Sequence, residues 1–171
     1  MVKLVLDAVQ QVRIKLRWNE LDEENRKIAE ARQQGKKYRP TELINEDTPK
    51  QLLARCRHSL SKPRYKWTLE QSLRMSIAFQ RYPQLETAYN HAQRLIRFYF
   101  NTNIQSAKSE IEQWTEDTFK YKKEVFYRCA KSLYYHMETI LNFFNNRSTN
   151  ASAESFNAKI KLFRANHTKK R

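Results

Sequence analysis

Glycine is almost missing from this sequence: Gly35 is the only one among 171 residues, and just four prolines accompany it. Sheet proteins need many tight turns, and such turns draw on glycine because it reaches positive φ without steric cost. The scarcity of both residues argues against a fold built from hairpins. We therefore predict an all-α fold, a bundle of about six to seven helices joined by short polar links.

Long apolar runs and closely spaced cysteines are also missing. No stretch approaches the roughly 20 apolar residues of a membrane-spanning helix, and the start does not resemble a signal peptide. Cys56 and Cys129 lie far apart, and the four histidines form no HxxxH or Cys/His cluster. These absences predict a cytoplasmic protein with reduced core thiols, no membrane association and no structural zinc.

Acidic residues are in short supply. Asp and Glu number 18 against 33 Lys and Arg, which gives a formal charge of +15. Such an excess raises the cost of compaction through self-repulsion, so a polyanionic partner, DNA or RNA, is the natural explanation. A helical protein with an alkaline isoelectric point and no nucleic-acid role is the alternative that charge alone leaves open.

Apolar residues recur at helical spacing through the first 145 residues. We expect helices over residues 1–34, 49–60, 68–82, 83–99 and 106–121, and then one long helix carrying Phe126 to Phe144 on its buried side. Thr48-Pro49 and the capping-box pair Thr68 and Gln71 mark two of the starts. Most aromatic residues share this spacing, which favours core packing over base stacking.

The closing segment has a different composition, since a Ser/Thr/Asn-rich stretch leads into a short helix. Its apolar stripe consists of Ala153, Phe156, Ile160 and Phe163. Its polar face carries Asn150, Glu154, Asn157 and Lys161, at i, i+4, i+7 and i+11. A carboxylate in the first turn suits the helix dipole and can ligate a hard divalent cation. Periodicity alone favours the simpler interpretation, an ordinary N-terminal glutamate with solvated lysines.

The run NRSTNASAESFNAKIKLFR, residues 146–164, resembles the block that closes the catalytic domain of bacterial insertion-sequence transposases of the ISL type. The family pattern is roughly N-x-x-x-E-[GS]-x-N-x-x-I-K. Residues 3–18 resemble the helix that follows the family's second catalytic aspartate, and residues 47–67 resemble its helical insertion. The resemblance thus extends from Lys3 to about Ala165, and its closing block is the most specific part.

This resemblance implies a ribonuclease-H-like DDE domain, in which two aspartates and a glutamate bind two metal ions, expected to be Mg²⁺. It makes Glu154 the third, catalytic and metal-binding, carboxylate. Both aspartates would precede Lys3, and Asp7 is not one of them. We therefore expect a truncated transposase that is inactive alone, so whether the chain is an enzyme stays open. The alternative is a non-enzymatic basic helical protein that binds nucleic acid or another protein.

The expected organisation has three parts: residues 1–145 as the helical insertion region, 146–165 as the loop and helix bearing Glu154, and 166–171 as a divergent basic tail. DNA is the expected partner. The candidate DNA contacts are Arg13, Lys15, Arg17, Asn150, Asn157, Lys159, Lys161 and Arg164. If Phe156, Ile160 and Phe163 lack a sheet to cover them, self-association or association with an intact transposase follows.

Overall fold

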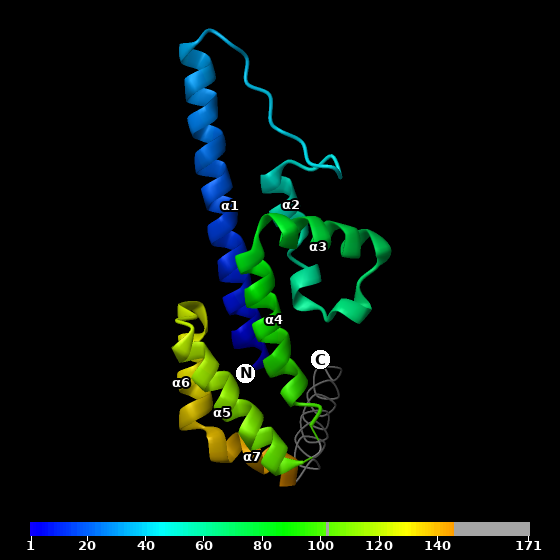
Figure 1. The fold of residues 1–171 in the computed structure, drawn as a ribbon, viewed down its shortest axis with the longest axis vertical. Helices are drawn as coiled ribbons and strands as arrows, with labels where there is room; N and C mark the ends of the chain where they lie inside the picture. Colours follow the sequence, from blue (N-terminus) through cyan, green and yellow to red (C-terminus); the bar gives the residue numbers. More distant parts are fainter. Residues whose placement is uncertain (102, 146–171) are drawn as a thin grey trace, which may run out of the picture.

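The computed structural model describes residues 1–101 and 103–145, and every regular element in these ranges is a helix (Figure 1). The α-helices are α1 (Val2–Gln33), α2 (Pro49–Arg55), α3 (Leu69–Arg81), α4 (Pro83–Phe98), α5 (Ile104–Lys120), α6 (Tyr127–Tyr135) and α7 (Met137–Asn145). Three short 3₁₀ helices join them: η1 (Ser59–Ser61), η2 (Arg64–Lys66) and η3 (Glu124–Phe126). The predicted all-α fold is confirmed.

Capping residues fix the starts of α2 and α3. The Thr48 hydroxyl accepts a hydrogen bond from the Gln51 amide at 3.3 Å, and the Gln51 side chain accepts one from the Thr48 amide at 2.9 Å. Thr68 and Gln71 repeat this reciprocal arrangement. Each box satisfies two backbone donors that a helix N-terminus otherwise leaves open, so both helices begin where the sequence predicts.

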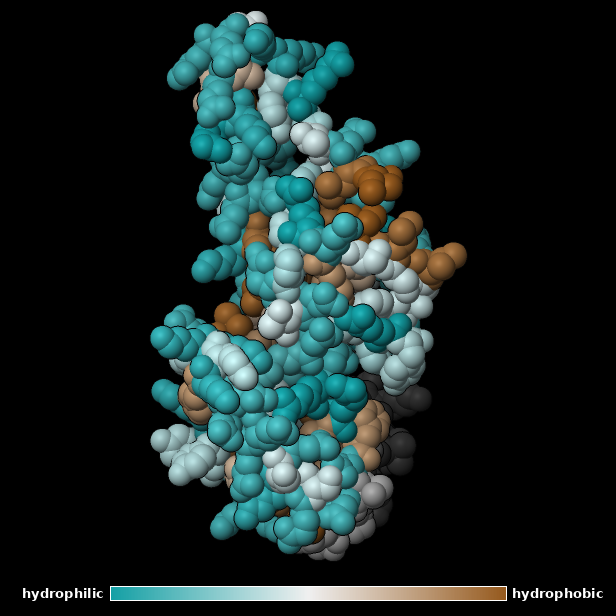
Figure 2. All heavy atoms as spheres, in the orientation of Figure 1, coloured by the Kyte–Doolittle hydropathy of each residue, from teal (hydrophilic) through white to brown (hydrophobic). Residues whose placement is uncertain are grey.

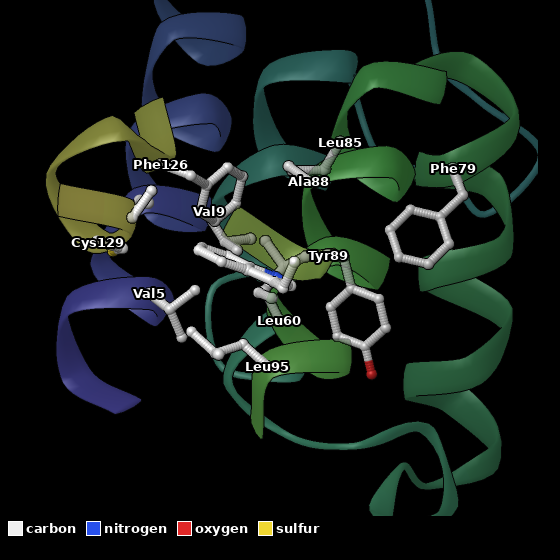
Figure 3. Close-up of a cluster of buried hydrophobic side chains, with 14 of the residues drawn as sticks. Val5, Val9, Leu60, Phe79, Leu85, Ala88, Tyr89, Leu95, Phe126 and Cys129 are labelled. Carbon is white, nitrogen blue, oxygen red and sulfur yellow. The ribbon is translucent and has the colours of Figure 1, made fainter. Parts of the chain in front are cut away.

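The N-terminal half of α1 is the central element of the core. Figure 3 shows Val5 and Val9 of α1 packed with Leu85 and Ala88 of α4, and the Phe126 ring lies beside Val9, 5.0 Å from the ring of His91 of α4. The first four of these side chains are at most 6% exposed. The second half of α1 projects beyond this core (Figure 1), as its sparse apolar residues indicate.

The projecting half of α1 is attached to the rest of the chain by polar contacts. Glu24 pairs with Lys50 of α2 at 2.5 Å. Glu20 accepts hydrogen bonds from the Tyr82 hydroxyl at 2.6 Å and from the Arg81 guanidinium at 3.2 Å. These contacts hold the helix against α2 and the α3–α4 junction without an apolar core.

The end of helix α2 differs from the sequence prediction. Helix α2 ends at Arg55 rather than near Leu60, because the following turn places Ser59 and Leu60 in the core. The Trp67 indole then donates to the Ser59 carbonyl at 2.9 Å, and the Tyr89 hydroxyl donates to the Lys62 carbonyl at 2.8 Å. These bonds anchor the connector between α2 and α3, for which the sequence predicted only a break between two helices.

The predicted long C-terminal helix is instead two helices with a break at His136. The His136 amide donates to Ser132 and its carbonyl accepts from Ile140, so the backbone groups at the break are satisfied. A straight rod would carry the following residues away from α4. The break turns α7 so that Leu141 is buried and the Phe144 ring lies 5.0 Å from that of Phe98.

A buried histidine joins α4 to α5. His91 stacks on Trp114 with ring centroids 4.4 Å apart, and its Nε2 lies 2.8 Å from the Thr118 hydroxyl. That hydroxyl donates to the Trp114 carbonyl, so it accepts from Nε2–H. The Lys123 ammonium lies 3.1 Å from Nδ1 and donates to it. Burial, reinforced by the charges of Lys123 and Arg94, lowers the pKa of His91 to about 3.

We expect His91 to make stability depend on pH. Its pKa is lower in the folded chain than the ordinary value of about 6.5, so between pH 6.5 and 3 the unfolded chain binds the extra proton. The free energy of unfolding therefore falls as pH drops through that window, by at most about 1.4 kcal/mol per pH unit from this group.

Urea unfolding of the wild type and of His91→Gln between pH 4 and 7 measures this effect. The variant should show a shallower pH dependence, whereas the exposed His58→Gln should retain the slope of the wild type. Equal slopes in all three proteins would contradict the neutral state of His91.

Candidate nucleic-acid interface

Only some of the basic side chains in the described residues form ion pairs with carboxylates. Ion pairs engage Arg26, Lys27, Lys50, Arg55, Arg64, Arg74, Arg81, Arg94 and Lys108. Within residues 1–101 and 103–145, the remaining basic residues take part in no ion pair: Lys3, Arg13, Lys15, Arg17, Arg32, Lys36, Lys37, Arg39, Arg57, Lys62, Lys66, Arg97, Lys120, Lys122, Lys123, Arg128 and Lys131. Apart from Lys123, whose ammonium group donates to His91, the second group is therefore available to an external anion.

Helix α1 separates the three basic residues that the sequence grouped as DNA contacts. Successive residues turn by about 100° around a helix. Arg13 and Arg17 therefore lie within about 40° of each other, whereas Lys15 lies about 160° away from Arg13. The structure brings the two arginines together and places the lysine on the opposite side.

A third arginine, Arg57, joins this side of α1 from the end of α2. Its backbone carbonyl accepts a hydrogen bond from Gln10 Nε2 at 2.9 Å. The charges of Arg57 and Arg17 both lower the pKa of Arg13, after the larger effect of burial. Sequence reasoning missed Arg57, because nothing in its neighbourhood shows that α2 ends against α1.

Lysines also surround exposed tyrosine rings at two other places. The ammonium groups of Lys120 and Lys123 lie 5.6 and 5.5 Å from the Tyr121 ring, and that of Lys66 lies 5.8 Å from the Tyr65 ring. These tyrosines are 61% and 79% exposed. The expectation that aromatic residues pack in the core therefore does not hold for them.

An apolar surface accompanies α3. Figure 2 shows hydrophobic side chains gathered over this helix, toward the upper right of the view. Leu69 and Leu73 are 89% and 57% exposed, and Ile44 of the preceding link is 94% exposed. Leu73 is one of the apolar residues that recur through α3. Its exposure shows that this part of the apolar stripe has no cover among the described residues.

The remaining predicted site residues lie outside the described part of the chain. They are the catalytic and metal-binding candidate Glu154 and the DNA-contact candidates Asn150, Asn157, Lys159, Lys161 and Arg164. Phe156, Ile160 and Phe163, on which the expected self-association rests, lie there too. Among the residues that the structure does describe, no three His, Cys, Asp or Glu side chains are grouped to hold a metal ion. This part of the chain therefore offers no metal site for comparison with the predicted one.

The same described residues include no helix that is both long and apolar enough to cross a membrane.

A family model described as a transposase, of the DDE class and ISL3 type, matches residues 1–167. No curated protein and no solved structure matches the chain.

Proposed function

Because this chain belongs to the ISL3-type family of DDE transposases, we propose that it contributes DNA-contacting helices to a DNA transposition reaction. The family interacts with DNA and generally depends on divalent metal ions. The observation that carries the proposal is the basic side of α1. Arg13 and Arg17 lie one turn apart, the positive charge of Arg57 acts on Arg13, and none of the three forms an ion pair with a described residue.

DNA fits this surface better than a protein partner does. A phosphate backbone offers one negative charge per nucleotide, and neutralising it releases condensed counterions. An exposed cation without a carboxylate partner contributes the full free energy of counterion release when it binds a phosphate. An ion-paired cation must first break its ion pair. Phosphate contacts of this kind position a protein on DNA but read no sequence.

Two arginines of α1 provide a matched test. We expect Arg17→Gln to weaken binding to duplex DNA and to reduce the slope of log affinity against log salt by about one, because one phosphate contact is lost. Arg26→Gln should change neither quantity appreciably, because Arg26 is bound to Glu23 at 2.6 Å. Fluorescence anisotropy across a salt series measures both. No binding at low salt, or binding that ignores salt, would remove the proposed DNA contact.

For Glu154 we propose the role that the family resemblance assigns, the third carboxylate of a two-metal site. Mg²⁺ is the proposed ion, because it prefers hard oxygen ligands. Such a site activates the attacking oxygen and stabilises the leaving oxygen in an in-line displacement at phosphorus. In this proposal Asn150 and Asn157, four residues before and three residues after Glu154 in the sequence, orient the carboxylate or a substrate oxygen.

Glu154 alone should not suffice for chemistry. We expect the purified chain to leave supercoiled plasmid intact in Mg²⁺ or Mn²⁺, because a single carboxylate binds these ions weakly and a two-metal site needs several. Gel electrophoresis of the plasmid detects a single nick. Metal-dependent nicking by the wild type that disappears in Glu154→Gln would show that the chain is catalytic by itself.

A non-enzymatic role is the second candidate, and the uncovered apolar residues of α3 favour it. In this role the chain is a basic DNA-binding protein that also associates with an intact transposase, and both roles place it with DNA in the cytoplasm. Adding the chain to a cleavage reaction of an intact family member separates the two. A change in that reaction's rate favours the second role, and an unchanged rate argues against it.

A further inference from the structure

Arg13 occupies a position that its helix otherwise gives to core residues. It follows Val9 by one turn and precedes Leu16 by nearly one, and all three are buried, with Arg13 only 8% exposed. Its Nε donates to Gln10 Oε1 at 2.7 Å and its Nη1 donates to the Leu53 carbonyl at 3.2 Å. Both acceptors are neutral. No ion pair among the described residues includes Arg13.

The surroundings of this guanidinium are unfavourable for a cation. Burial removes solvation, and the positive charges of Arg57 and Arg17 lower the pKa of Arg13 further. A buried charge without a counter-ion is costly, more so beside like charges. Since a guanidinium has five N–H donors and the described residues accept from two of them, three remain for a ligand.

We propose that Arg13, Arg17 and Arg57 form a binding site for a single phosphate group, which the DNA backbone supplies. Two phosphate oxygens accept two parallel hydrogen bonds from one arginine, whereas a chloride ion offers a single acceptor atom. One anion among the three guanidinium groups would satisfy the open donors of Arg13 and screen the repulsion. The identity of the ligand as DNA rests on the proposed function, whereas the anion site itself does not.

Lys15 provides the matched control. It is an unpaired cation two residues from Arg13, but helical geometry places it on the opposite side of α1. A general attraction of anions to a basic protein would involve both residues, whereas the proposed site involves only Arg13.

Thermal unfolding in sodium phosphate and in sodium chloride at equal ionic strength tests the site without DNA. Phosphate should raise the Tm of the wild type and of Lys15→Met above its value in chloride by a few degrees, about 3–6 °C at concentrations well above Kd. Arg13→Met and Arg57→Gln should lose that increment. In chloride, Arg57→Gln should be at least as stable as the wild type, because a repulsive charge is gone.

The general stabilising effect of phosphate on apolar burial is common to all four proteins and cancels in the comparison. Should Arg13→Met fail to fold, Arg57→Gln still decides, because Arg57 is exposed and its substitution leaves no cavity. A phosphate increment that persists in Arg57→Gln would overturn the site, and so would an equal loss in Lys15→Met.

Binding to duplex DNA supplies the second arm. Arg57→Gln should weaken binding about 3- to 10-fold and reduce the salt slope by about one, while Arg26→Gln, whose guanidinium group is paired with Glu23, retains wild-type values. If the wild type binds DNA but the rise in its Tm in phosphate does not depend on Arg13 and Arg57, the anion site is rejected and the proposed function is retained. If the rise in Tm in phosphate depends on these arginines but the chain does not bind DNA, the anion site is retained and DNA is rejected as its ligand.

Discussion

Burial of the apolar stripe on the first half of α1 is the interaction on which the rest of this structure depends. Val5, Val9 and Leu16 give α1 a face that contacts α2 and α4, while η3 packs at its N-terminal end. Ala88 and Ala92 keep the facing side of α4 small, which allows the two helices to approach closely. Without this contact the other elements would share no common core.

The same stripe imposes an electrostatic cost, because one of its positions is occupied by Arg13. A hydrocarbon side chain there would bury apolar area without losing solvation of a charge. The helical packing that stabilises α1 therefore also buries a guanidinium group on which the positive charges of Arg17 and Arg57 act. If DNA is the ligand, as we propose, its phosphate would relieve a repulsion that the free protein retains.

Polar contacts hold the projecting part of α1 and add to the packing of α4 against α5. Glu20 and Glu24 attach the projecting part of α1 to the α3–α4 junction and to α2. At the other end, His91 stays neutral between Thr118 and Lys123 and links α4 to α5. The cations used in these contacts are unavailable to DNA, so the fold itself divides the basic residues into structural and exposed groups.

The sequence by itself determined the helical class, the starts of α2 and α3 and the apolar face of α4, because scarce glycine, capping residues and 3.6-residue periodicity act locally. It also carried the family resemblance and the assignment of Glu154, which rests on a motif. Tertiary structure decided the break at His136, the exposure of Leu73 and the position of Arg57 on the side of α1 that carries Arg13. Each of these depends on which helix packs against which, and side-chain spacing along one helix contains no information about its neighbour.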